Sequence, residues 1–72
     1  MFSKEIFSKR LFDLRKQHNL SQFQLGEIVG LTQMAISRVE KAERAVSIEV
    51  LYALADYFNV SIDYLIGRSD TP

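Results

Sequence analysis

The 72-residue sequence contains no cysteine, so neither a disulfide framework nor a thiolate zinc site is available to stabilise it. It also lacks any apolar run close to the roughly 18 residues of a membrane-spanning helix. Residues 1–5 lack the apolar stretch and cleavage site of a signal peptide. A chain this short buries only about 60% of its unfolded surface, which supports one domain with a thin core. We expect a soluble cytoplasmic protein with no membrane partner.

Catalytic and metal-binding motifs are missing too. His18 is the single histidine, and there is no cysteine to complete a metal site or a catalytic dyad. Nothing matches a nucleophile elbow, a phosphate-binding glycine loop or a metal triad. We therefore expect no enzyme activity, no cofactor, no metal and no small-molecule ligand. His18 is better explained as a residue at the end of a helix, where its ring, when protonated, interacts favourably with the carbonyl dipole.

The chain carries no net charge, because nine Lys/Arg residues balance nine Asp/Glu residues. Neutrality argues mildly against a nucleic-acid partner. Residues 1–45, however, carry eight basic and five acidic residues, whereas residues 46–72 carry one and four. A domain polarised in this way can offer a basic face to phosphate although the whole chain is neutral. An offset of three charges also arises by chance, so it has little weight alone.

The spacing of apolar residues predicts five helices, and no segment shows a competing strand pattern. The expected helices cover residues 3–17, 22–29, 33–41, 48–58 and 62–66. Ser3 starts the first range and a Ser or Thr stands directly before each of the others, and Ser21 with Gln24 fits the capping box. Because the connections are short, we expect a compact all-α domain of five helices over residues 1–67. Residues 68–72 then form a short tail or the start of a linker.

Residues 21–40 predict two short helices joined by a tight turn. Such a crossing needs a small residue where the backbones approach and a turn residue that tolerates positive φ, and Gly26 and Gly30 stand at these places. Apolar side chains must also lock the pair to the rest of the domain, and the candidates are Leu25, Val29, Leu31, Ile36 and Val39. A small protein gains most from this unit by laying the second helix in the DNA major groove. DNA binding is therefore the leading prediction.

Further motifs run in order along nearly the whole chain: Arg10-Leu11…Leu14-Arg15, Leu20-Ser21-Gln22…Leu25-Gly26, Ile36-Ser37…Glu40, Ser47-Ile48-Glu49…Leu51…Leu54-Ala55 and Val60-Ser61-Ile62-Asp63-Tyr64-Leu65-Ile66-Gly67. With them the sequence closely resembles the lambda-repressor-like helix-turn-helix family, the xenobiotic-response-element type that includes phage repressors and Cro proteins. The resemblance implies a sequence-specific transcriptional regulator of double-stranded DNA. It further implies a homodimeric repressor on a palindromic operator, associated with the nucleoid of a bacterial or phage system.

The sequence departs from the family pattern at two positions. Ala42 stands where the family often has glycine, and Val46 stands where it often has proline. Alanine in a left-handed helix cap costs roughly 1 kcal/mol relative to glycine. Either the third helix extends beyond Glu40 or the following loop takes another path.

The exposed face near the start of the third helix should meet the DNA bases. Gln33 is the strongest candidate, because its amide can pair bidentately with N6 and N7 of adenine. Met34 offers apolar contact to a thymine methyl, or it is a partly exposed packing residue. Ser37 and Arg38 follow one turn later, and Arg38 either reads guanine or holds a phosphate.

Phosphate contacts are expected around the same unit. The resemblance assigns one to Gln22, at the amino end of the second helix, where free backbone amides and the helix dipole favour an anion. Ser21 and Thr32 cap their helices and are candidates to contact phosphate as well. Lys41 and Arg44 lie past the third helix, where the DNA backbone would run.

Two further pairs of residues have roles implied by the resemblance. Arg15 and Glu40 form an ion pair between the first and third helices, so Glu40→Ala should destabilise the fold and leave sequence preference unchanged. Tyr64 and Ile66 lie on the helix through which relatives commonly dimerise. Two exposed aromatic residues have no assigned role, Phe12 and Phe23.

Alternatives stay open in two classes. Within the same class, the chain fits an activator, a restriction–modification controller or the DNA-binding domain of a larger regulator. From another class, it fits a protein-interaction module of the same fold, of antitoxin or antirepressor type, which the neutral charge and the spare phenylalanines favour. Co-purification with a protein, without salt-dependent DNA binding, would support that module.

Overall fold

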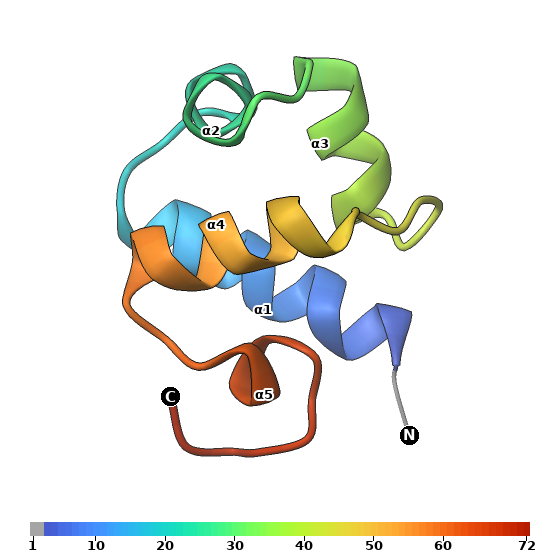
Figure 1. Ribbon diagram of the computed structural model, residues 1–72. Helices are drawn as coiled ribbons and strands as arrows, with labels where there is room; N and C mark the ends of the chain where they lie inside the picture. The colour runs from blue at the N-terminus through green and yellow to red at the C-terminus, as the bar shows by residue number, and fades with distance from the viewer. Residues whose placement is uncertain (1–2) are drawn as a thin grey trace.

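Five α-helices and their connections make up residues 3–72, which are the residues that the computed structural model describes (Figure 1). The helices are α1 (Lys4–Gln17), α2 (Gln22–Val29), α3 (Gln33–Glu40), α4 (Ile48–Phe58) and α5 (Ile62–Leu65). No strand occurs within this range. The all-α prediction is confirmed, with α3 and α5 each ending one residue earlier than expected.

Directly before every helix stands a Ser or Thr whose hydroxyl oxygen accepts a hydrogen bond from a backbone amide three residues later. Each of these bonds satisfies one of the amides that a helix start leaves without a partner. At α2 the capping box is complete, because Gln24 Oε1 also accepts from the Ser21 amide. The predicted helix starts are confirmed at Ser3, Ser21, Thr32, Ser47 and Ser61.

The carboxyl end of α3 shows whether the helix extends beyond Glu40 or ends there, the two alternatives left open by Ala42. The helix ends at Glu40, and Ala42 adopts the left-handed conformation with a φ of 61°. The Glu43 amide then donates to the Arg38 carbonyl at 2.9 Å, which closes the helix end. The third helix therefore does not extend, and an alanine occupies a conformation that glycine adopts more easily.

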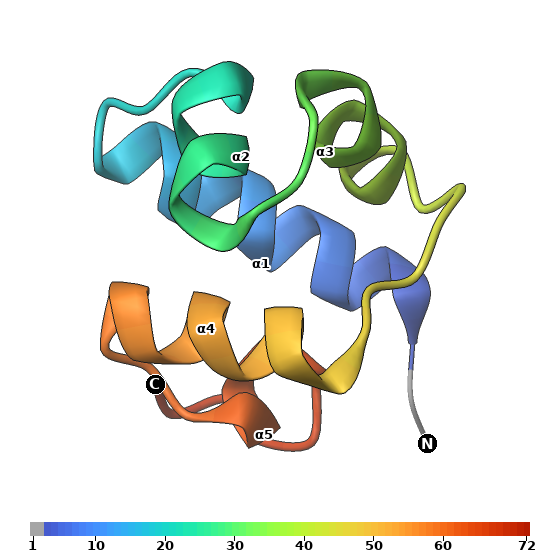
Figure 2. The same cartoon turned by 45° about the horizontal axis from the view of Figure 1, so that its top comes forward.

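The core lies where the five helices meet around α1. α2 and α3 cover one side of α1, and α5 lies on the opposite side, as both views show (Figures 1 and 2). In Figure 1, α4 lies in front of α1, between the α2–α3 pair and α5. Each helix contributes an aliphatic side chain with no exposed surface, and these are Leu11, Leu25, Ile36, Leu54 and Leu65. One shared core of this kind holds all the helices in a single unit.

Residues 68–72 fold back against the helices, where a tail or the start of a linker was expected (Figure 2). Arg10 of α1 donates to the carbonyl oxygens of Tyr64 and Ser69 and pairs with Asp70. Its guanidinium also lies over the Tyr64 ring, 4.2 Å from the ring centroid. The Ser61 amide donates to the Pro72 carbonyl at 2.9 Å, so both ends of this segment are bonded to the domain.

Membrane-spanning helices and metal-binding clusters are both absent from residues 3–72. None of the five helices is long and apolar enough to cross a bilayer. Nor do these residues bring together three His, Cys, Asp or Glu side chains in a group that could hold a metal ion. Met1 and Phe2, part of the segment considered for a signal peptide, lie outside the described residues.

Candidate nucleic-acid interface

The α2–turn–α3 unit depends on two glycines with different functions. A Cβ atom on Gly26 would collide with the Leu31 carbonyl oxygen, so only glycine allows the turn to approach α2 this closely. Gly30 has a φ of 78° and open space around the position of a Cβ, so it is needed for its backbone conformation alone. Together they set the angle at which α3 leaves α2 (Figure 2).

α3 has one face in the core and one face toward solvent. Ala35, Ile36 and Val39 are buried, which fixes the helix on the domain. The predicted base contacts are on the other face, where Gln33, Met34 and Arg38 are exposed and Ser37 is partly exposed. The structure therefore brings the four candidates together on one outward surface.

A shallow groove of about 600 Å³ lies between the amino ends of α2 and α3. Its walls are Gln22, Phe23, Thr32, Gln33, Met34 and Ser37. Met34 and Phe23 expose 65% and 55% of their surfaces, so the groove has an apolar side beside its amides and hydroxyls. Phe23 had no predicted role, although its position directly after the first residue of α2 placed it beside the expected phosphate contact.

The two helix ends beside the groove provide a positive potential. Ser21 and Thr32 use their hydroxyl oxygens to cap α2 and α3, at 3.0 Å in both cases. In each helix the first backbone amides still have no acceptor within the helix. These amides and the helix dipoles favour an anion at the groove edge. Gln22, the predicted phosphate contact, is the first residue of α2.

The predicted cationic contacts lie at the far end of α3. Arg38 is exposed in its last turn, Lys41 is its C-cap residue, and Arg44 lies in the loop that leads to α4. Lys41 and Arg44 are exposed as well. A groove with two positive helix ends and a cationic loop is a suitable surface for a polyanion.

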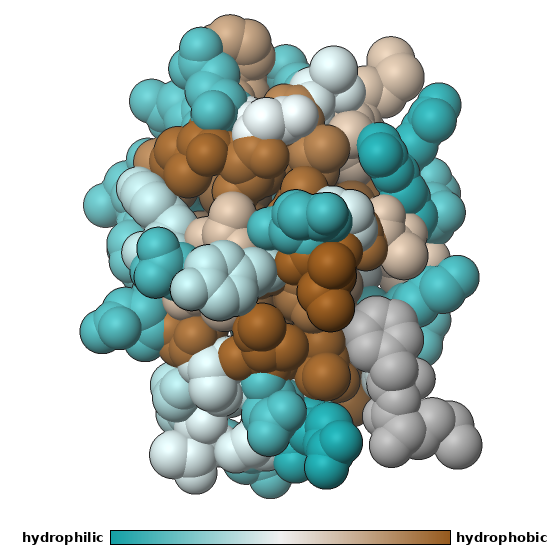
Figure 3. All heavy atoms as spheres, in the orientation of Figure 1, coloured by the Kyte–Doolittle hydropathy of each residue, from teal (hydrophilic) through white to brown (hydrophobic). Residues whose placement is uncertain are grey.

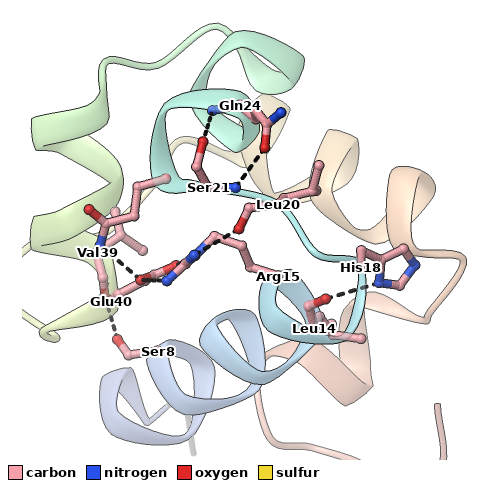
Figure 4. A network of polar contacts seen from close by, with 10 residues as sticks. Ser8, Leu14, Arg15, His18, Leu20, Ser21, Gln24, Val39 and Glu40 are labelled. Carbon is pink, nitrogen blue, oxygen red and sulfur yellow. Dashed lines mark hydrogen bonds and ion pairs between the residues drawn. The ribbon is translucent and has the colours of Figure 1, made fainter.

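Behind the groove, Arg15 and Glu40 form a buried ion pair between α1 and α3 (Figure 4). Arg15 Nε and Nη2 donate to the two Glu40 carboxylate oxygens at 2.6 and 3.0 Å. Their side chains are only 9% and 5% exposed. Arg15 Nη1 also donates to the Leu20 carbonyl, and Gln22 Nε2 donates to Glu40 Oε1 at 3.1 Å. The last bond connects the ion pair to the groove, and the sequence did not indicate it.

Tyr64 and Ile66, predicted at a dimer interface, are both partly buried in the single chain. Tyr64 packs against the core and beneath the Arg10 guanidinium. Ile66 lines a cavity of about 260 Å³ with Phe7 and Leu51 among its neighbours. Larger exposed apolar surface occurs on α4, at Ile48 and Tyr52, which are 75% and 66% exposed. The dimer interface stays a prediction.

Comparison with known proteins agrees with this geometry. A family model described as helix-turn-helix matches residues 11–65. The control protein C.SmaI of Serratia marcescens is 42% identical, over 90% of this chain and 77% of its own length. The uncharacterised HTH-type transcriptional regulator YobD of Bacillus subtilis is 33% identical, over 93% of this chain and 60% of its own length. The P22 c2 repressor, crystallised in complex with a synthetic operator, superposes with a TM-score of 0.82 at 33% identity, covering 89% of this chain and 97% of that chain. With a match over most of its length and the α2–α3 crossing described above, this chain belongs to the helix-turn-helix family.

Proposed function

We propose that this protein is a sequence-specific transcriptional regulator that places α3 in the major groove of double-stranded DNA. The observation that carries the proposal is the outward face of α3, where Gln33, Met34, Ser37 and Arg38 are available while the opposite face is buried. The positive amino ends of α2 and α3 lie beside that face and would receive the phosphates. Lys41 and Arg44 would extend the contact along the DNA backbone.

A homodimeric repressor on a palindromic operator is the form that we propose. Two copies related by a twofold axis would read half-sites about one helical turn apart. The P22 c2 repressor, which was crystallised with a synthetic operator, supports the repressor and operator parts of this proposal by its similarity to the present chain. In this proposal the protein is not an enzyme, in keeping with its similarity to the control protein C.SmaI and the P22 c2 repressor.

Selection from a random DNA library, followed by sequencing, tests the proposal. The expected result is an enriched half-site in inverted repeat, with affinity that falls steeply as salt rises from about 50 to 200 mM. The spacing of the repeat would also give the dimer geometry. No enrichment, or binding that salt does not weaken, would contradict the proposed function.

Gln33→Ala should relax the sequence preference at one position of the half-site. A bidentate amide–adenine pair is worth about 1–3 kcal/mol of discrimination, so the preference for adenine should fall by about 5- to 150-fold. Competition assays with operators changed at single base pairs would measure it. Gln17→Ala, an exposed glutamine at the end of α1, is the matched control and should bind as the wild type does. If Gln33→Ala discriminates all operator variants as the wild type does, Gln33 reads no base.

A second candidate is a protein-interaction module of the same fold. It is favoured by the exposed Ile48 and Tyr52 on α4. Apolar surface gathers on the side of the molecule where α4 lies in front (Figure 3). Patches of this kind often mark protein contacts. Co-purification with a protein partner, combined with DNA binding that shows no salt dependence, would favour the protein-interaction module over the transcriptional regulator.

A further inference from the structure

We propose that Glu40 is a positioning residue for DNA binding: its buried carboxylate orients the side-chain amide of Gln22 so that one N–H is directed to a DNA phosphate. The inference rests on the proposed DNA binding and goes beyond it. It gives a residue without access to DNA an effect on affinity. Glu40 would act through the hydrogen bond that Gln22 Nε2 donates to its Oε1 atom.

The Glu40 carboxylate is held firmly enough to orient a neighbour. Arg15 donates to both of its oxygens, and Arg15 is itself anchored by its bond to the Leu20 carbonyl. The side chains of both members of the pair are more than nine-tenths buried. Glu40 therefore presents a fixed acceptor to the start of α2.

A fixed carboxylate determines which way the Gln22 amide faces. A carboxylate only accepts hydrogen bonds, so it selects the –NH₂ group of Gln22 and turns the Oε1 atom away. One N–H is used by Glu40, and the second remains free on a residue that lines the groove. A phosphate also only accepts, so this N–H is the group that it needs. An unrestrained glutamine would instead rotate and would have to be ordered when DNA binds.

Glu40→Gln should change the DNA affinity in the direction opposite to the one that charge alone predicts. Glu40→Gln removes a negative charge, and charge alone would strengthen binding to a polyanion. If Glu40 orients Gln22, the same change must weaken binding, because a glutamine at position 40 can accept or donate and no longer selects one orientation. The loss should be roughly three- to tenfold, the value of one hydrogen bond of this kind. It should be equal for all DNA sequences, since phosphates carry no sequence information.

The experiment measures the affinity of four variants for a short mixed-sequence DNA duplex between about 50 and 200 mM salt. Gln22→Ala and Glu40→Gln should each weaken binding, and Glu40→Gln should cause no further loss in the Gln22→Ala background. Ser8→Ala is the structural control. It removes the buried hydrogen bond that Ser8 Oγ of α1 donates to the Val39 carbonyl of α3 and leaves all hydrogen bonds of the Glu40 carboxylate in place. It should lower thermal stability and leave the affinity of the folded protein unchanged.

A measurement on the wild type covers the case in which Glu40→Gln does not fold. Side-chain amide relaxation in NMR should show Gln22 more ordered than the exposed Gln17 in the free protein. Equal mobility of the two amides would overturn the inference, as would a Glu40→Gln loss no larger than that of Ser8→Ala. Absence of salt-dependent binding by the wild type would overturn the proposed function, and the inference with it.

Discussion

Ala42 is the residue at which the backbone conformation and the side chain disagree. Its φ of 61° is left-handed, which costs a residue with a Cβ about 1–2 kcal/mol. Asn19 and Asn59 adopt the same conformation, with φ of 55° and 56°, but asparagine is among the residues that tolerate it. The end of α3 is therefore formed by the surrounding packing in spite of the local preference of an alanine.

Ala42→Gly should stabilise the protein. Glycine removes the left-handed strain but has more freedom to lose on folding, so the net gain should be about 0.5–1 kcal/mol. Chemical denaturation would measure it as a higher midpoint at an unchanged slope. Ala45→Gly is the matched control in the same loop, because Ala45 has no positive φ, and it should be neutral or slightly destabilising. A lower stability of Ala42→Gly would show that the alanine is not strained.

At the scale of elements, the crossing of α2 and α3 determines where the candidate interface points. The Leu31 amide donates to the Gly26 carbonyl at 2.8 Å, and the Leu31 carbonyl occupies the space that a Cβ on Gly26 would need. Both contacts are between backbones, so neither can be relieved by a side-chain rotation. The angle between the two helices is therefore sensitive to a single methyl group.

Gly26→Ala should be more damaging than Gly30→Ala. The first change forces two backbone segments apart and should cost about 2–3 kcal/mol. The second adds a methyl group in open space and should cost only the left-handed strain of about 1–2 kcal/mol. Thermal melts of both variants would rank them, and Gly26→Ala should also lose DNA affinity because α3 is displaced. Equal destabilisation by the two changes would contradict the close approach at Gly26.

At the scale of the whole molecule, Arg10 connects the first helix to the last residues of the chain. It contacts the end of α5 and residues 69 and 70, while Pro72 accepts from the start of α5. The guanidinium is mostly buried, whereas the Asp70 carboxylate is fully exposed. The bonds to the carbonyl oxygens should therefore stabilise this closure more than the exposed ion pair does.

Arg10→Ala should loosen α5 together with residues 68–72. Hydrogen bonds from a charged donor contribute about 1.5–3 kcal/mol each, and they compete with water, so a total loss of about 2–3 kcal/mol is expected. Hydrogen exchange should become faster in α5 and the final segment and stay slow in α3. Lys9→Ala breaks an exposed pair with Asp13 on the same helix and should change stability by less than about 0.5 kcal/mol. Uniformly faster exchange would mean that Arg10 supports the whole core.

Much of the fold could be predicted because its signals are local. The five helix starts follow from Ser and Thr side chains that bond to amides three residues away. The buried face of α3 follows from apolar spacing at Ile36 and Val39, and the structure adds Ala35 beside them. The end of α3 could not be decided in this way, because the cost at Ala42 is small compared with the packing that follows it.

The sequence by itself determined the helices, the glycines of the crossing, the family and the residues available on the outer face of α3. The helices, the glycines and the outer face of α3 depend on neighbours within one or two helical turns, and the family depends on the order of short motifs along the chain. One contact between distant residues, the Arg15–Glu40 ion pair, was expected from the family resemblance. The tertiary structure decided the others. It joined Gln22 to Glu40 across 18 positions and Arg10 to Asp70 across 60. It also placed Phe23 in the groove with Met34. Such contacts arise from the packing of whole helices, which has no signature in the spacing of residues along the chain.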